Sequence, residues 1–371
     1  MKRIFTYLLL VFSVLSCREK EVLPAVSPSD IRFSVPKVAD TKSVLIEDKS
    51  QLKIGDDVLG YSVFAARYIP SETGAITKHQ QFMTNIKIQS TDDGSSWDYD
   101  SDGAKEGNQH FYWSPGAVHK FFAVYPYYDP DSDTYDLGFE YGINEAEHAL
   151  QATGKHETGS GTQKLICTGL DDSGKNICPD ILYGVQMYSE PYKVGDQRAP
   201  IKFTMSHALS AVSLRIRNAS EYVITGVAAG EITGFENASE YVRLSDDAPV
   251  WGPLSTVAHT FDVPDITSNI SAGQYHPDSD SYWCTVLMIP QNFGSYPQSP
   301  SFTFTVTFGD GIGNKTYTIN FKDYQVQNTA EYAYSFLPGR HYEYNLNVTS
   351  SAISCHVDVV PWIEDEPIKL N

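Results

Sequence analysis

The sequence lacks any apolar run long enough to cross a membrane. The one long apolar stretch, residues 4–15, has about 12 residues, whereas a spanning helix needs about 20. It follows Lys2 and Arg3 and ends at Leu15-Ser16-Cys17, directly before a charged segment. A basic start, a short apolar run and a small residue before a cleavage point are typical of an export signal. We therefore expect residues 1–16 to be removed on export.

Positive charge is also scarce. The chain has 27 Lys and Arg residues against 46 Asp and Glu residues, a formal net charge of −19, and no basic cluster offsets it. Such a chain repels nucleic acid and anionic lipid surfaces. We therefore predict neither nucleic acid nor a charged lipid surface as a binding partner.

Recognisable catalytic and metal motifs are missing. The ten histidines are scattered, and HExxH, GxSxG, a Gly-rich phosphate loop and CxxC spacing do not occur. His207, in the segment His-Ala-Leu-Ser, is better explained as a structural junction residue than as a catalytic base. The sequence therefore predicts a protein that is not an enzyme, needs no cofactor and has no metal centre.

Two acidic loops match half of a calcium-loop pattern each. In the first, four acidic residues occupy positions 1, 3, 5 and 12, but position 6 is Thr134 rather than glycine. The second has acidic residues at positions 1, 3 and 5 and Gly103 at position 6, but Gln109 at position 12. We expect solvated loops rather than ion sites. The acidic residues are Asp129, Asp131, Asp133 and Glu140 in the first, and Asp98, Asp100 and Asp102 in the second.

Only five cysteines are present, and disulfides are permitted in an exported chain. Cys167 and Cys178 flank a Gly- and Asp-containing loop and form one candidate disulfide. Cys284 and Cys355, on two predicted strands of one domain, form a second candidate. The alternative for each pair is buried free thiols.

Aromatic residues and turn-forming residues are abundant, which favours short strands over long helices. We count at least ten strands and one short helix candidate, over residues 144–151. A phase change in the alternating pattern predicts a bulge or strand break over residues 207–211. The fold class is all-β, with two β-sandwich-like domains in tandem. Residues 17–30 are a tether, 31–200 the N-terminal domain and 201–371 the C-terminal domain.

The end of the export signal resembles the lipobox of bacterial lipoproteins. This resemblance implies cleavage before Cys17 and attachment of lipid to it. The alternative is an ordinary secretory signal that happens to contain a cysteine.

Five segments along the chain resemble the fimbrillin family, the subunits of type V pili. They are IRFSVPKVADTKS, FYWSPGAVHKFFAVYPYY, IKFTMSHALSAVSLRIRN, LPGRHYEYNLNVT and ISCHVDVVPW. The resemblance implies two transthyretin-like β-sandwich domains and delivery to the outer membrane as a lipoprotein. It also implies a trypsin-like protease that removes the first strand, and donor-strand exchange between subunits.

The residues that would carry this exchange can be named. The family's cleavage site matches Lys42 best, in place of the usual Arg, and Arg32 is the second candidate. Ile31, Phe33 and Val35 are the apolar side chains of the strand to be displaced. A donor strand needs the same alternation near a free end. Its candidate residues are Val357, Val359, Trp362, Ile363, Ile368 and Leu370.

Two alternatives to assembly remain. Both segments could be ordinary edge strands of a monomer, and the chain could be a monomeric surface protein that binds glycans, anchored by lipid. An aromatic surface over residues 111–128 would suit a sugar. The expected partners are other pilus subunits, the maturation protease and a host receptor or glycan.

Overall fold

The computed structural model describes most of the chain as strands and turns. Among the described residues the only helical element is a single 3₁₀ turn, Phe321–Asp323, and no helix there is long and apolar enough to cross a membrane. The fold class is all-β, as predicted. The described residues are 29–34, 36–38, 53–54, 58–71, 76–90, 97–99, 111–127, 139–145, 148–154, 156–157, 163–166, 180–245, 248–256, 261–277, 282–324 and 334–361.

The N-terminal half is built on an eight-stranded sheet with the order β1-β12-β11-β6-β3-β4-β5, and β2 pairs with β3. The long strand β3 carries apolar side chains on both faces, because both faces of the sheet are covered there: Val63 and Ala65 belong to one core and Phe64 to another. The bounds are β1 Lys37–Val38, β2 Lys53–Ile54, β3 Val58–Pro70, β4 Ile76–Ser90, β5 Trp97–Tyr99, β6 Val118–Tyr125, β11 Leu182–Tyr188 and β12 Thr204–His207.

Strands from both halves of the sequence cover one face of this sheet. One cover sheet has the order β17-β16-β8-β7, and a smaller one has the order β18-β15-β10-β9. Leu150, Val242 and Leu244 from these strands pack in one core with Phe64 and Phe122 of the large sheet. The bounds are β7 Phe139–Asn144, β8 Ala149–Gly154, β9 His156–Glu157, β10 Gln163–Ile166, β15 Ala238–Ser239, β16 Tyr241–Leu244, β17 Val250–Trp251 and β18 Leu254–Ser255.

The predicted helix over residues 144–151 is wrong. β7 and β8 form a hairpin there, and β8 pairs on its other side with β16. Leu150 and Ala152 are buried in one core with side chains of the large sheet, so tertiary packing overrides a helix-compatible composition.

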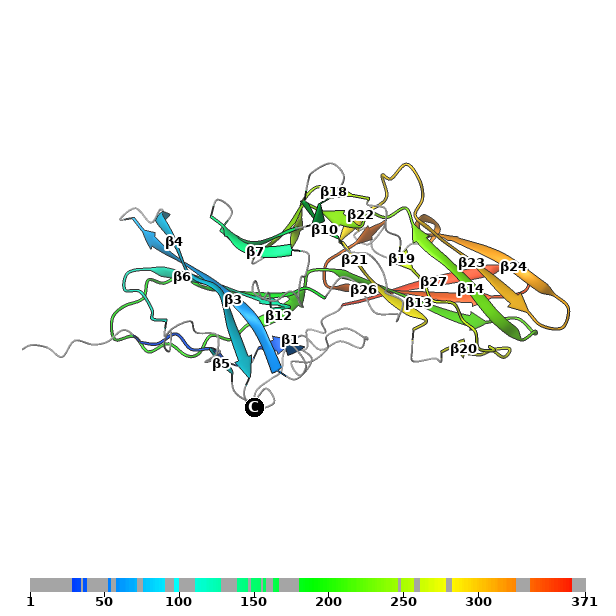
Figure 1. Ribbon diagram of the computed structural model, residues 1–371, viewed down its shortest axis with the longest axis horizontal. Coiled ribbons are helices and arrows are strands. Elements are labelled where there is room, and N and C mark those ends of the chain that lie inside the picture. Colours follow the sequence, from blue (N-terminus) through cyan, green and yellow to red (C-terminus); the bar gives the residue numbers. More distant parts are fainter. Residues whose placement is uncertain are drawn as a thin grey trace, which may run out of the picture.

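The C-terminal half is a sandwich of two sheets, at the other end of the elongated molecule (Figure 1). One sheet has the order β20-β13-β26-β27 with β21 beside β13, and the other has the order β19-β14-β23-β24. A β22–β25 pair flanks them. The bounds are β13 Ser210–Asn218, β14 Ile224–Thr233, β19 Phe261–Asp262, β20 Tyr275–His276, β21 Cys284–Met288, β22 Gln291–Asn292, β23 Ser301–Phe308, β24 Gly313–Asn320, β25 Ser335–Phe336, β26 Arg340–Val348 and β27 Ile353–Pro361.

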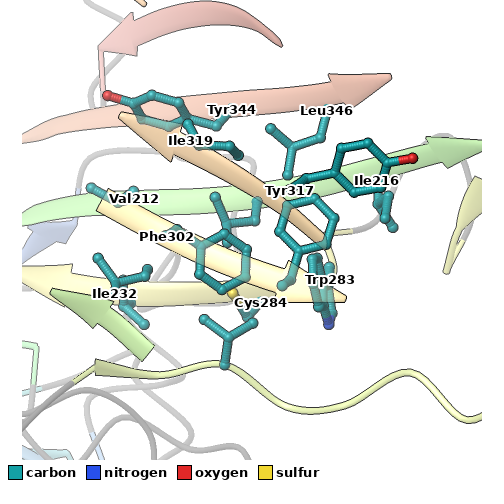
Figure 2. Packing of buried hydrophobic residues seen from close by; sticks show 14 of the residues in the cluster. Val212, Ile216, Ile232, Trp283, Cys284, Phe302, Tyr317, Ile319, Tyr344 and Leu346 are labelled. Atoms are coloured by element: carbon teal, nitrogen blue, oxygen red, sulfur yellow. The ribbon is translucent and has the colours of Figure 1, made fainter. Parts of the chain in front are cut away.

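The core of this sandwich follows the alternation of the sequence. Figure 2 shows Val212 and Ile216 of β13 facing Phe302 of β23 and Tyr317 of β24. The threonines that alternate with the aromatics on β23 lie on the opposite face, where Thr305 contacts Thr316 of β24 at 2.9 Å. β23 therefore buries every second side chain, which stabilises one register of pairing.

The two halves join at residues 207–211, where the predicted break is confirmed. β12 ends at His207 in the large sheet, and β13 begins at Ser210 in the sandwich. Ala208 and Leu209 are fully buried between them. Since β12 and β16 both pair with N-terminal strands, pairing crosses the expected boundary at residue 200. The division into two domains at that residue stays a prediction.

The predicted disulfide between Cys284 and Cys355 is wrong, because both are free cysteines. Cys284 lies on β21 and Cys355 on β27, and the strands β13 and β26 lie between them. Neighbouring strands are about 4.8 Å apart, so the two residues are far beyond the roughly 4.4–6.8 Å between Cα atoms that a disulfide allows. Cys167 and Cys178 lie outside the described residues.

Candidate functional site: the N-terminal strand slot

The N-terminal segment enters the large sheet between two parts of the chain that are distant in sequence. Asp30 forms an antiparallel bridge with Tyr112, and Phe33 forms a parallel bridge with Ile201. Further along, β1 pairs in parallel with β12, beside it in Figure 1. We call the space between residues 111–113 and 201–205, which residues 29–38 enter, the N-terminal strand slot.

Backbone hydrogen bonds hold the segment on both sides of the slot. The Ile31 amide donates to the Phe111 carbonyl at 2.8 Å, and the Trp113 amide donates to the Ser29 carbonyl at 3.2 Å. On the other side the Ile201 amide donates to the Arg32 carbonyl at 2.7 Å, and the Ser34 amide donates to the Ile201 carbonyl at 2.9 Å. The segment is therefore hydrogen-bonded through its backbone on both edges, as a strand within a sheet is.

The side chains of the segment alternate between core and solvent. Ile31 is fully buried and Phe33 is 6% exposed, whereas Asp30 and Arg32 are exposed. Both buried side chains belong to the core on the face of the large sheet opposite the two cover sheets. The structure therefore places two of the three predicted slot residues in the core, and Val35 lies outside the described residues.

Ser29 fixes the beginning of the segment. Its hydroxyl lies 2.7 Å from the Tyr192 hydroxyl and donates to the Asp196 carbonyl at 2.9 Å. Tyr192 is 1% exposed, and its backbone bonds Gly116 and Ala117 across the loop. This buried tyrosine therefore connects the start of the segment to two loops of the N-terminal half.

A cluster of aromatic rings surrounds Trp113 at the same end of the slot. The guanidinium of Arg198 lies 4.6 Å from the ring centre of Trp113, 5.0 Å from Tyr188 and 5.6 Å from Tyr192. His119 packs edge-on against Trp113, with 5.0 Å between ring centres. Burial, and secondly the Arg198 charge, lower the pKa of His119 to about 4. The imidazole is therefore neutral near pH 7, and its Nε2 accepts a hydrogen bond from the Ser114 amide.

The structure describes only one of the two candidate cleavage residues, Arg32. Arg32 is exposed, but its carbonyl is hydrogen-bonded inside the slot. Lys42 lies outside the described residues. A protease must extract residues 31–34 before it can bind Arg32 in extended form, so the occupied slot protects this site.

Two of the six predicted donor residues lie before Pro361, in the described part of the chain, and four lie after it. Val357 and Val359 lie on β27 and pair with Tyr344 and Tyr342 of β26. Val357 is 6% exposed and packs in the sandwich core. These two residues are thus part of the sandwich of their own subunit in this structure. The remaining four, Trp362, Ile363, Ile368 and Leu370, lie outside the described residues.

The other predicted features are distributed over the fold without forming a site with the slot. His207 lies at the junction, where its Nδ1 is 3.0 Å from the buried Asp180 carboxylate. Asp98 lies within β5 and Glu140 within β7, and the other acidic residues of both loops lie outside the described residues. In the described part of the chain, no three His, Cys, Asp or Glu side chains form a ready-made metal site.

Sequence reasoning missed the residues that line the slot. Ser29, Tyr192 and Asp196 belong to segments that read as tether and polar link, because single polar residues in loops carry no periodic signal. The contact between Arg198 and Trp113 could not be predicted from the sequence either. The one available signal was the aromatic content of residues 111–128, which marks a core without naming its partners.

A family model described as fimbrillin-like matches residues 169–362, more than half of the chain. The chain belongs to the fimbrillin-like family. No protein with a curated description matches it.

Several solved structures are similar in fold to this fimbrillin-like protein. A fimbrial protein from Bacteroides vulgatus is 15% identical with a TM-score of 0.54, over 90% of this chain and 99% of that one. Its similarity supports the shared fold. Two others have lower scores. A fimbrial assembly protein from Parabacteroides distasonis is 9% identical with a TM-score of 0.41, over 90% and 99% of the two chains. The tip fimbrial protein Mfa3 from Porphyromonas gingivalis, with a C-terminal truncation, is 14% identical with a TM-score of 0.35, over 90% and 100%.

Proposed function

We propose that this fimbrillin-like protein is a structural subunit or accessory adhesin of a type V pilus at the cell surface. It is exported as a lipoprotein through Cys17 and reaches the outer membrane with residues 29–38 in the N-terminal strand slot. A trypsin-like protease then removes this segment, and a strand from another subunit enters the slot. The protein acts by assembly, without catalysis. Family membership and its similarity to a fimbrial protein support this role.

The observation that carries the proposal is the double hydrogen bonding of a segment near the N-terminus whose side chains belong to the core. Removing it would leave the backbone groups of Phe111, Trp113 and Ile201 without partners and empty the sites of Ile31 and Phe33. Each unpaired buried group costs about 1–3 kcal/mol. A strand from a second subunit restores both the hydrogen bonds and the packing, so the empty slot favours assembly.

The position of cleavage decides how much of the slot is emptied. Cleavage after Lys42 would release both buried anchors and β1 together. Cleavage after Arg32 would leave Phe33 and β1 attached to the subunit. Lys42 is therefore the better proposal for the maturation site, although the family usually has Arg there.

The donor strand is proposed to begin beyond Pro361. Val357 and Val359 would have to leave β27 to act as donors, which would break their pairing with β26 and expose the sandwich core. Trp362, Ile363, Ile368 and Leu370 can serve without that loss, and they supply the apolar side chains that a slot requires.

The test is the N-terminal residue of protein sheared from intact cells, determined by mass spectrometry, beside heated and unheated denaturing gels. We expect Ser43 at the N-terminus and a ladder of polymers that resists detergent until it is heated. A Lys42→Ala variant should stay unprocessed and monomeric. A lipid-modified Cys17 with a single monomer band in the wild type would overturn the proposal and favour an anchored monomer that binds glycans.

A further inference from the structure

Two histidines from distant parts of the sequence lie close together beside Tyr68, near the C-terminal end of β3. His79 lies on β4 beside Tyr68 of β3, and His148 lies in the turn between β7 and β8. The ring centres of His79 and His148 are each 5.1 Å from that of Tyr68 and 6.3 Å from each other. Glu145, in the same turn as His148, places a carboxylate oxygen 3.1 Å from His79 Nδ1.

Three of the four imidazole nitrogens of these two histidines are buried and make no hydrogen bond in the described part of the chain. Only 9% of the His79 side chain is exposed. Within the described part of the chain, His79 Nε2 and His148 Nδ1 have no hydrogen-bond partner, and His79 Nδ1 has the Glu145 carboxylate 3.1 Å away but not in hydrogen-bond geometry. A buried polar atom left unsatisfied costs about 1–3 kcal/mol, and such atoms commonly mark a bound ion or water. Three of them together therefore require an explanation.

The backbone is arranged to hold His148 in this place. His148 has a φ of 49°, in the left-handed region that few non-glycine residues adopt. Its carbonyl accepts a hydrogen bond from the buried Lys120 ammonium at 3.0 Å. Strained backbone held by a specific contact is typical of functional positions.

We propose that His79 and His148, with the Glu145 carboxylate, bind a divalent transition-metal ion such as Zn²⁺. Imidazole nitrogen suits zinc, copper and nickel, whereas calcium and magnesium prefer oxygen ligands. Metal–imidazole bonds are about 2.0–2.1 Å long, so two rings that share an ion have centres about 5–6.5 Å apart. The 6.3 Å between these rings lies within that range.

The carboxylate would complete the site by rotating toward the rings. In this structure the three side chains do not surround one point, because no three His, Cys, Asp or Glu side chains of the described chain are arranged to hold a metal ion. The Glu145 side chain is 70% exposed, so it can change rotamer at little cost, while the buried histidines are already in place. A carboxylate ligand also offsets the positive charge of nearby Lys120, and water can fill the remaining position.

The experiment uses the full chain without an affinity tag, stripped with a chelator and titrated with ZnCl₂ by calorimetry. We expect one ion per chain at this site. His79→Ala and His148→Ala should each weaken binding by more than about 100-fold, because loss even of an outer-shell partner costs about 10–100-fold. His356→Ala is the matched control, since His356 is exposed and lies 2.9 Å from Asp358. It should bind as the wild type does.

A second measurement covers variants that fold poorly. Electron paramagnetic resonance of the wild type loaded with one equivalent of Cu²⁺ should show coupling to two imidazole nitrogens. Absence of saturable Zn²⁺ binding would overturn the inference. Equal binding by wild type and a folded His79→Ala/His148→Ala variant would mean an adventitious ion only. The pilus proposal does not depend on either result.

Discussion

Phe33 of the N-terminal segment stacks on Phe203, with ring centres 6.1 Å apart and 15° between the ring planes. Phe203 is fully buried and also contacts Tyr61 of β3 edge-on. The segment is therefore joined to the centre of the N-terminal core by its side chains as well as by its backbone. Predictions about its stability and its release follow from these contacts.

Phe33→Ala should lower the free energy of unfolding by about 3–5 kcal/mol, because it removes a buried ring and leaves a cavity beside Phe203. Urea unfolding followed by fluorescence measures the change. Arg32→Ala, on the exposed side of the same segment, should stay within about 0.5 kcal/mol of the wild type. Equal effects from the two variants would contradict the burial seen here.

Tyr192→Phe should loosen the start of the segment while keeping the packing of the ring. It removes the hydroxyl that contacts Ser29, worth about 1 kcal/mol. Hydrogen exchange at the amides of Ile31 and Trp113 should become several-fold faster, and cleavage after Arg32 by added trypsin should increase. Tyr112→Phe, at a tyrosine that is 46% exposed, should change neither rate.

The junction histidine should couple to its acidic partner. His207→Ala and Asp180→Ala each remove one side of a buried 3.0 Å contact. A double-mutant cycle by urea unfolding should give a coupling free energy of about 0.5–3 kcal/mol. Purely additive effects of the two substitutions would show that the contact does not stabilise the junction.

Acid should destabilise the protein through two buried histidines. Burial, followed by the Arg215 charge, lowers the pKa of His341 to about 4, and His119 has a pKa of about 4 for similar reasons. The unfolded chain binds these protons near pH 6.5, so stability falls as the pH drops from about 6.5 toward 4. His119→Gln and His341→Gln should each flatten this dependence in melting curves, whereas His356→Gln, at an exposed site, should not.

The two free thiols of the sandwich should be inert in the folded protein. Burial raises the pKa of Cys284 and of Cys355 to about 12, so at pH 8 only about one thiol in ten thousand is ionised. Mass spectrometry after brief alkylation should find both unlabelled in the native state and labelled in urea. A peptide that contains Cys284 linked to Cys355 would contradict the strand order of the sheet.

The alternation of apolar and polar residues was enough to predict the all-β class and many of the strands. The pattern on β23 is an example, because its side chains alternate between buried and more exposed according to their parity. The phase change after Met205 likewise located the break between β12 and β13. Residues 144–151 were mistaken for a helix because a short segment with mixed composition carries no clear period.

Partners across the sheets could not be predicted in the same way. The separation of Cys284 from Cys355 depends on β13 and β26 lying between them, and the pairing of β16 with β8 joins residues from both halves. Parity states which face a side chain occupies but leaves the neighbouring strand undetermined.

The sequence by itself determined the class of fold, the alternation of Ile31 and Phe33, and the resemblance to fimbrillins, because these depend on local order along the chain. Only the tertiary structure decided that Ser29 meets Tyr192, that Arg198 covers Trp113 and that His79 lies beside His148. Each of these contacts joins single polar or aromatic residues from separate segments. Such contacts arise when strands are brought together by burial of their apolar faces, so no local sequence pattern predicts them.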